Sequence, residues 1–220
     1  MNGPSSEVSV LRLGAVVSVV QSVLFVVIGL AALVLGADRL VDSGFASLSV
    51  SNLLAFRILC GAFVFIAILG LAITPAERAA IERSNRGLAI FGSNLAYLGH
   101  AGTIAYFTWW LLVTRHGGTP DIAADTLAPI QWGVMFELVL VGGWVWIIAA
   151  VIRRDAHWPR WFFLLSVAKA IVFWFAFITF LTNSSWMIML GVGAVTFVAG
   201  PGWHLAIARV FLHRAKGDKP

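Results

Sequence analysis

Charged residues are scarce in this sequence: Asp, Glu, Lys and Arg together make up 11% of its 220 residues. Soluble domains carry roughly a quarter of their residues as charged side chains. The hydrophobic residues, 60% of the chain, also stand in long runs instead of following the helical or alternating period of half-buried elements. Together these features exclude a soluble globular protein.

Cysteine is almost absent as well, since Cys60 is the only one and lies inside an apolar run. A single cysteine forms no intramolecular disulfide and no cysteine-based metal site within one chain, so we expect a buried, inert thiol. The sequence also contains no phosphate-binding glycine loop, no HExxH motif and no grouping of Ser, His and Asp. These absences favour a non-enzymatic protein, without a cofactor or a bound metal, over an enzyme.

What the sequence does contain is a series of apolar segments, each long enough to cross a hydrocarbon core of about 30 Å as a helix. The first segment is longer than the apolar region of a signal peptide, so we expect it to remain as an uncleaved helix. The sequence therefore predicts a single all-α domain over residues 1–220, a polytopic transmembrane helix bundle with six spans. The predicted spans are residues 11–36, 51–74, 88–114, 130–152, 160–182 and 186–212.

The polar segments between the spans predict tails, loops and turns. Residues 1–10 are expected to form a disordered or interfacial tail, and residues 37–50 and 115–129 to form loops. Pro75 suits the start of a helix, and Glu82 and Arg86 stand four residues apart, so residues 75–87 predict a short surface helix. The turn at residues 183–185 is so short that the fifth and sixth spans must be antiparallel neighbours.

The basic residues of the loops indicate the orientation, because cytoplasmic loops of membrane proteins carry an excess of Lys and Arg. One predicted side holds only Arg39 and Arg115, so we expect the other side, and with it both termini, to be cytoplasmic. The basic residues on that other side are Arg12, Arg78, Arg83, Arg86, Arg153, Arg154, Arg160, Arg214, Lys216 and Lys219. This bias accounts for the net charge of +5, and nucleic acid is not an expected partner.

Apart from Arg12 and Arg160, which lie at the ends of their spans, the charged residues inside the predicted spans are Arg57, Glu137, Lys169 and Arg209. An uncompensated charge there costs about 2.5–3.5 kcal/mol on insertion scales and is a candidate functional residue. Arg57 and Glu137 each lie about 9 Å inside the outer end of their spans, so we predict that they form an ion pair. Arg209 lies close to the end of the sixth span and is expected to reach the headgroups.

Lys169 lies about 12 Å from the inner end of the fifth span, a long way for its side chain to reach the headgroups. His204 on the sixth span has a similar depth, so we predict that Lys169 faces the bundle interior near His204. A polar face on the third span completes the candidate residues: Ser93, Asn94, Tyr97 and His100.

Three more specific sites are disfavoured by the positions of these residues. His100 lies about 8 Å higher than His204 in the predicted bundle, so the two imidazoles do not face each other across a haem. A retinal-type Schiff base at Lys169 would lack a seventh helix and a clear carboxylate counter-ion. The residues His100, His204 and Glu137 are too scattered for the three-ligand site of a catalytic metal.

Two short runs carry a resemblance. The run Trp158–Trp161, with the sequence WPRW, opens the fifth span, and the run Asn183–Ser185 precedes the sixth. In this layout the chain resembles a group of uncharacterised bacterial six-helix integral membrane proteins, a domain of unknown function. The resemblance covers the layout of most of the chain. It implies a multi-pass protein of the bacterial plasma membrane and no established activity.

Two functions remain open at this point. The first is a non-enzymatic accessory, sensory or assembly subunit, in which the buried charges hold helices together. The second is a small transporter or channel-like protein, in which Arg57, Glu137, Lys169 and His204 line a polar cavity. A water-accessible pocket would favour the second, and dry, fully paired charges the first. The lipid bilayer is the expected partner, and a protein partner or a homo-oligomer is left open.

Overall fold

The computed structural model describes residues 4–35, 53–115, 124–155, 157–182 and 185–217, and this part of the chain consists of helices and short turns without a strand. The helices are α1 (Pro4–Leu35), α4 (Leu53–Glu82), α5 (Arg86–Val113), α6 (Ala124–Ile152), α7 (Arg160–Thr182), α8 (Ser185–Gly193) and α9 (Gly200–Ala215). The π-helical segment Ala194–Ala199 joins α8 to α9, so these three pieces form one continuous helix. The all-α class predicted from the sequence is confirmed for the described residues.

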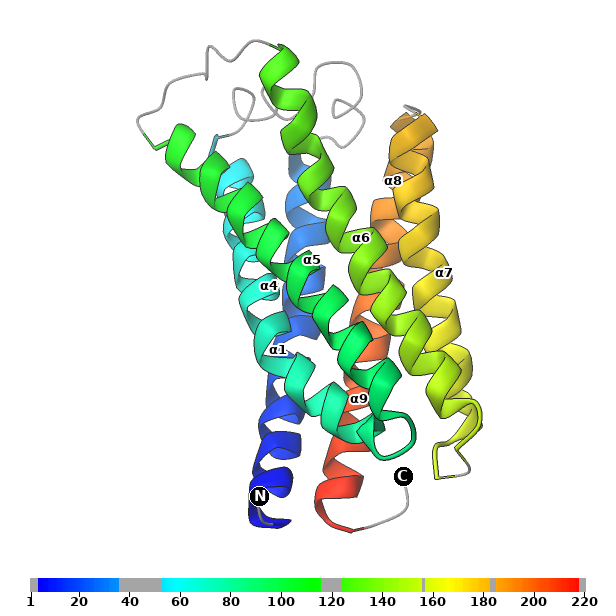
Figure 1. Ribbon diagram of the computed structural model, residues 1–220. Helices are drawn as coiled ribbons and strands as arrows, with labels where there is room; N and C mark the ends of the chain where they lie inside the picture. The colour runs from blue at the N-terminus through cyan, green and yellow to red at the C-terminus, as the bar shows by residue number, and fades with distance from the viewer. Residues whose placement is uncertain (1–3, 36–52, 116–123, 156, 183–184, 218–220) are drawn as a thin grey trace.

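The helices form a closed ring in which each packs against its neighbours in the sequence (Figure 1). α1 packs against α4, α4 against α5, α5 against α6, and α6 against α7. α7 then packs against the continuous last helix, and α9 closes the ring along α1. Side chains that point inward from all of these helices therefore meet in one interior.

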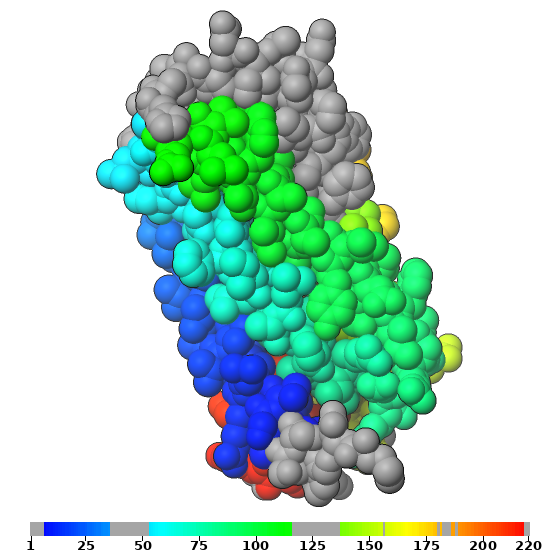
Figure 2. Space-filling view, turned by 60° about the vertical axis from the view of Figure 1, so that its left-hand side comes forward, coloured from blue at the N-terminus to red at the C-terminus, as the bar shows by residue number. Residues whose placement is uncertain are grey.

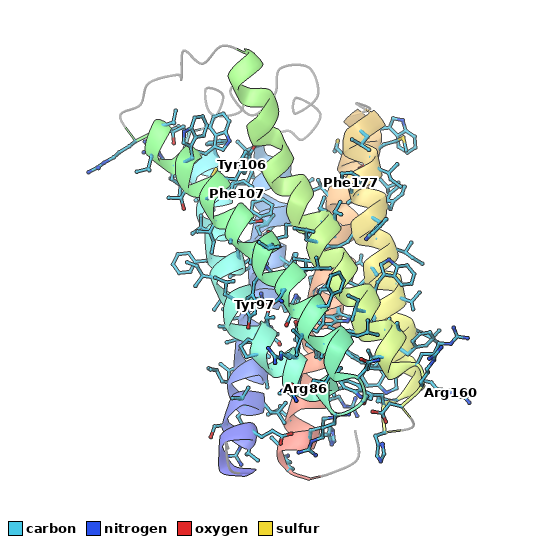
Figure 3. All side chains as sticks on the ribbon, viewed as in Figure 1. Arg86, Tyr97, Tyr106, Phe107, Arg160 and Phe177 are labelled. Carbon is cyan, nitrogen blue, oxygen red and sulfur yellow. The ribbon has the colours of Figure 1, made fainter. Side chains whose placement is uncertain are left out.

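The two termini lie at the same end of the bundle, together with the α4–α5 and α6–α7 turns (Figure 1). Arg83 and Arg153 belong to these turns, and Arg214 belongs to the last turn of α9. We call this end the basic end and the opposite end the far end. Figure 3 shows two more arginines, Arg86 and Arg160, at the basic end.

Several helices have the length and composition of membrane spans. Among the described residues, the stretches that are long and apolar enough to cross a membrane are Glu7–Leu35, Leu53–Glu82, Arg160–Thr179 and Met189–Ala215. α5 is equally long but is not in this group, because polar residues such as Asn94 and His100 lower its hydropathy. The apolar stretch found in α6, Glu137–Ile152, is shorter. These helices indicate a membrane protein.

The outer surface of the bundle also carries many large apolar side chains. Figure 2 shows α1, α4 and α5 side by side across one face. Large apolar side chains on these helices are exposed, among them Val23, Phe65, Phe91 and Leu98. Soluble monomers rarely expose apolar patches of this extent, whereas a lipid bilayer would cover them.

Two boundaries predicted for the basic end are wrong. α1 begins at Pro4, so most of the expected tail at residues 1–10 is helical. α4 continues through Pro75 as far as Glu82, so the separate surface helix at residues 75–87 does not exist. Glu82 ends α4 and Arg86 begins α5, and the 3.4 Å contact between Arg86 Nε and Glu82 Oε1 bridges the turn between them.

The buried face of α4 explains why Pro75 does not end the helix. Ile73, Ala76, Ala80 and Ile81 are all buried, on both sides of the proline in the sequence. Burying this apolar surface favours one uninterrupted helix over a break at Pro75, even though the proline lacks one backbone donor. The apolar face, and not the proline, decides where α4 ends.

The other connections agree only in part with the sequence prediction. α6 begins at Ala124, inside the loop predicted at residues 115–129 and six residues before the predicted span at 130. The loop predicted at residues 37–50 and the turn residues 183–184 lie outside the described residues. α7 and α8 lie side by side and antiparallel, as predicted for the fifth and sixth spans (Figure 1).

The last helix has a wider turn shortly before its proline. Pro201 has no backbone N–H to donate to the preceding turn. The Gly200 N–H bonds to the Val195 carbonyl, five residues earlier, and the whole segment Ala194–Ala199 has this wider π-helical turn. Such segments in an α-helix are rare and frequently occur at functional sites.

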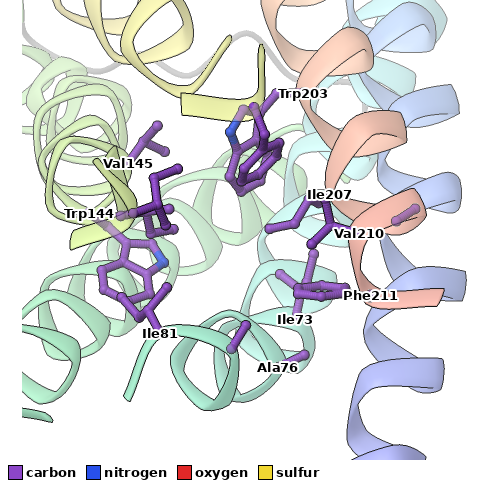
Figure 4. Close-up of a cluster of buried hydrophobic side chains, with 14 of the residues drawn as sticks. Ile73, Ala76, Ile81, Trp144, Val145, Trp203, Ile207, Val210 and Phe211 are labelled. Carbon is purple, nitrogen blue, oxygen red and sulfur yellow. The ribbon is translucent and has the colours of Figure 1, made fainter. Parts of the chain in front are cut away.

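Two apolar cores fill the ring at different heights. The core nearer the basic end includes Trp144, Phe162, Trp203 and Phe211, several of which Figure 4 shows converging from different helices. The core nearer the far end is built around aromatic side chains such as Phe107, which Figure 3 places in the upper half of the bundle. Buried polar side chains also enter this interior, among them Lys169 and His204.

Candidate functional site

Glu77 on α4 is the most deeply buried carboxylate of the described residues, with 4% of its surface exposed. The indole Nε1 of Trp144 on α6 donates a hydrogen bond of 2.5 Å to Glu77 Oε2. The carboxylate also interacts electrostatically with Lys169 and His100. Glu77 is therefore held by α6 and faces the charged and titratable groups of two further helices.

Lys169 on α7 is equally enclosed, with 2% of its surface exposed. Its Nζ atom lies 3.3 Å from His204 Nε2 on α9 and 3.7 Å from the ring centroid of Trp203. The ammonium group interacts electrostatically with Glu77 and Glu137. The prediction that Lys169 faces the interior near His204 is confirmed.

The indole beneath Lys169 is itself fixed by hydrogen bonds. Trp203 Nε1 donates to Ser166 Oγ at 3.0 Å, and Ser166 Oγ donates to the Phe162 carbonyl at 2.8 Å. Figure 4 shows Trp144 and Trp203 entering the same interior from different helices. An ammonium over the face of an indole is attracted by the ring quadrupole, so Trp203 offers the lysine a favourable cation–π contact.

His100 and Glu137 complete the group from α5 and α6. Their Nδ1 and Oε1 atoms lie 3.5 Å apart, an ion-pair contact that forms no hydrogen bond. The imidazole of His100 rests directly on α4, because a Cβ at Gly70 would lie 2.4 Å from it. A Cβ at Gly99 would lie 3.6 Å from Glu137 Cα, so α5 and α6 also approach closely here. Gly70 thus leaves room for the His100 ring, and Gly99 lets α5 pack against α6 beside Glu137.

We call Glu77, His100, Glu137, Lys169 and His204 the polar cluster, which α4, α5, α6, α7 and α9 contribute one residue each. It brings together two carboxyl groups, one amine and two imidazoles, all of which can bind or release a proton. Among the described residues, the Nδ1 atoms of the two histidines have no hydrogen-bond partner. The cluster therefore has the groups needed to take up and pass on a proton.

The predicted ion pair between Arg57 and Glu137 is wrong. Arg57 donates to the backbone carbonyl of Thr114, at the end of α5, and makes no ion pair with Glu137. Glu137 lies opposite Gly99 and beside His100, whereas Arg57 reaches Thr114, fifteen residues and so about 22 Å further along α5. The two side chains therefore lie at different heights.

The other residues of the predicted polar face on α5 contribute less than expected. Ser93 is buried, but its hydroxyl donates to the Ile90 carbonyl of its own helix at 3.0 Å. Tyr97 is half-buried, and Figure 3 shows it on the half of α5 nearer the basic end. Asn94 is exposed and points away from the interior. Of this face, only His100 belongs to the polar cluster.

Glu77 was missed because residues 75–87 were predicted to be a surface helix. The signal that identifies it is helical spacing across Pro75: Ile73 and Ile81 lie four residues before and four residues after Glu77. Residues four apart share one face of a helix, so a continuous α4 places the carboxylate on a buried apolar face. Both isoleucines are buried, as this spacing requires.

A pocket of about 1070 Å³ opens at the basic end, and we call it the basic pocket. Its lining includes Ala80, Arg83, Arg153, Arg154, Asp155 and Arg214. Partial burial would raise the pKa of the Asp155 carboxyl, but hydrogen bonds from Ser84 and from the His157 backbone and ring outweigh it and lower the pKa below its ordinary value. Asp155 therefore stays ionised and ties the α4–α5 turn to the α6–α7 turn.

The fold and the apolar surface define a class, an α-helical bundle with the features of a membrane protein. No family model, no curated protein and no solved structure matches the chain. In the part of the chain that the structure describes, no three His, Cys, Asp or Glu side chains are placed to hold a metal ion. The function has to be inferred from the chemistry of the polar cluster itself.

Proposed function

We propose that this chain is a small transporter of the bacterial plasma membrane, with six spans and both termini in the cytoplasm, in which the polar cluster binds a proton that is exchanged with the transported solute. The observation that supports this most directly is the meeting of acidic, basic and imidazole side chains from separate helices at one buried place. Such residues are costly inside a membrane and typically mark the paths of protons, ions and substrates.

The short distance between the basic pocket and Glu77 supports entry of protons to the polar cluster from the basic end. The basic pocket reaches Ala80 on α4, three residues and so about one helical turn from Glu77. Under the proposed topology this pocket faces the cytoplasm. A proton that enters it has roughly 5 Å of helix to pass before it reaches the Glu77 carboxylate.

The far half of the bundle is closed by apolar packing. Phe56, Phe107 and Trp110 are fully buried there. Phe63 and Phe107 stack with ring centroids 4.3 Å apart. This arrangement corresponds to a state that is closed toward the outside, so transport requires a second state in which these rings separate.

The π-helical segment Ala194–Ala199 provides a place for such a change. It precedes α9, which carries His204, and Pro201 is the second residue of α9. Helices bend at π-helical turns and at prolines. In several transporter folds, helices that are broken near the middle of the membrane border the binding site.

Thiol labelling tests whether the cluster opens to water. In a Cys60→Ala background, Ser166→Cys places a thiol beside Trp203 while leaving the polar cluster intact, and Lys169→Cys places one inside it. A transporter must expose this region during its cycle, so both thiols should react with a membrane-impermeant maleimide. The rate for Ser166→Cys should change with pH, since protonation of the cluster changes the balance between its states.

Ala170→Cys is the matched control. Ala170 is fully buried and belongs to the apolar core, so its thiol should remain unlabelled in the same background. If neither Ser166→Cys nor Lys169→Cys reacts in intact or opened vesicles, the transporter proposal is wrong.

A second candidate is an accessory, sensory or assembly subunit in which the cluster only holds the helices together. The enclosure of Lys169 favours it, because His204, Trp203 and Phe173 surround the ammonium at short range. Such a protein would act through a protein partner or through further copies of this chain in the bilayer. Absence of labelling at both positions, combined with loss of stability when the charges are removed, would support this candidate.

A further inference from the structure

We propose that the basic pocket binds a phosphate group, carried either by a lipid headgroup or by a soluble molecule. The pocket receives Arg83 from the α4–α5 turn, Arg153 and Arg154 from the α6–α7 turn, and Arg214 from the end of α9. Four arginines from three separate places in the sequence therefore line one cavity. Guanidinium groups in this arrangement match the charge and the hydrogen-bonding geometry of a phosphate.

The acidic residues of the pocket leave part of this positive charge uncompensated. Glu7 Oε2 lies 2.6 Å from Arg83 Nη2, so this pair balances itself. Asp155 accepts hydrogen bonds from Ser84 and His157. Among the described residues, neither Arg153 nor Arg154 takes part in an ion pair, and both are exposed at the rim. With four arginines against two carboxylates, the lining carries two excess positive charges.

Arg214 is held in position before any ligand arrives. Its Nη1 atom donates to the Ala80 carbonyl at 2.6 Å, and its guanidinium lies 4.0 Å from the ring centroid of the buried Trp158. A guanidinium has five donors, so the remaining N–H groups are available to the pocket. Because the side chain is already ordered, a bound phosphate loses little binding free energy to fixing it.

The orientation rule for membrane proteins explains why arginines are abundant at this end, but not why these four converge. Arg86 and Arg160 are also exposed at the basic end (Figure 3), and neither lines the pocket. They have the same charge and face the same aqueous side. Replacing these two arginines therefore tests whether anions bind in the pocket itself or are attracted to the basic end in general.

The test uses the full chain in a neutral detergent and two probes, inorganic phosphate and dihexanoyl phosphatidylglycerol. Binding is followed by a saturable change in intrinsic tryptophan fluorescence, because Trp158 lies under Arg214. The pocket variant carries Arg153→Gln and Arg154→Gln, and the control variant carries Arg86→Gln and Arg160→Gln. Both lose two positive charges at exposed positions, so both should fold like the unmodified chain.

We expect the unmodified chain to bind at least one probe saturably. The pocket variant should weaken this binding by about tenfold or more, and the control variant by less than about twofold. Saturation by phosphate indicates a soluble ligand, and saturation by the phospholipid alone indicates a lipid headgroup. The proposal fails if neither probe saturates, or if both double variants weaken binding equally. Arg214→Lys, which keeps the charge but loses the planar fork, provides a second variant and should also weaken binding. The outcome does not depend on whether the polar cluster transports a proton.

Discussion

Glu77 is a buried carboxyl group for which neighbouring residues have to replace water. Its carboxylate accepts a hydrogen bond from Trp144 and interacts with the Lys169 ammonium, and it is almost completely buried. Burying a charge is tolerated only when its partners offset the lost hydration, and removing one partner leaves the other uncompensated. The free energy of unfolding should therefore depend on Glu77 and Lys169 jointly.

A double-mutant cycle measures this dependence. Glu77→Gln keeps an acceptor for the Trp144 indole and removes the negative charge, and Lys169→Met removes the positive one. Each single change should lower the unfolding temperature in detergent, because the surviving charge is left uncompensated. The double variant should be less destabilised than the sum of the two by about 0.5–3 kcal/mol.

Asn94→Ala is the control for the cycle, since Asn94 is exposed on α5 and lies outside the polar cluster. Combined with Lys169→Met, it should give an additive effect. Additivity in the Glu77 cycle as well would show that the two charges do not interact and would contradict the cluster as described.

At the scale of single helices, glycines on α5 decide how closely its neighbours approach. A Cβ at Gly92 would lie 2.2 Å from the Cε3 atom of Trp144, the residue that binds Glu77. At Gly102, on the same helix, a Cβ would meet nothing within 4 Å. The first glycine is therefore required by tertiary packing, and the second is not.

Alanine at these two positions should have opposite effects on the free energy of unfolding. Gly92→Ala should destabilise the protein by about 1–3 kcal/mol, because Trp144 has to move away from α5. Gly102→Ala should leave stability unchanged or raise it by up to about 1 kcal/mol, since alanine favours the helix. Thermal unfolding in detergent measures both, and equal effects would contradict the close packing of Trp144 on Gly92.

At the scale of the whole molecule, the position of the termini depends on the number of spans. Both termini and two of the turns lie at the basic end (Figure 1), as a ring of antiparallel helices requires. If every helix of the ring crosses the membrane, this end faces the cytoplasm, because the excess of basic residues lies there.

Reporter fusions test this topology. A reporter joined after Gly118 and one joined after Pro220 should indicate opposite sides of the membrane, with the second in the cytoplasm. A fusion after Asn85, in the α4–α5 turn, should agree with the one after Pro220. If the fusions after Gly118 and Pro220 indicate the same side, either the number of spans or the orientation is wrong.

The sequence by itself determined that the chain is helical and roughly where each helix lies. Long apolar runs with few charges leave the backbone no water to bond with, so its donors and acceptors must pair within each segment. The meeting of Lys169 with His204 could also be predicted, because the connection between their helices is short and their depths match. Both results depend on local composition and on distance along the chain.

Only the tertiary structure decided which other charges meet. Glu77 was missed because Pro75 suggested a helix end, and Glu137 contacts His100 instead of Arg57. Loop composition locates a helix end only to within several residues, whereas each residue moves a side chain along the helix by about 1.5 Å and around it by about 100°. Contacts between helices therefore depend on where each helix ends, which of its faces points inward and where glycines allow close packing. These features are known only from the packed bundle.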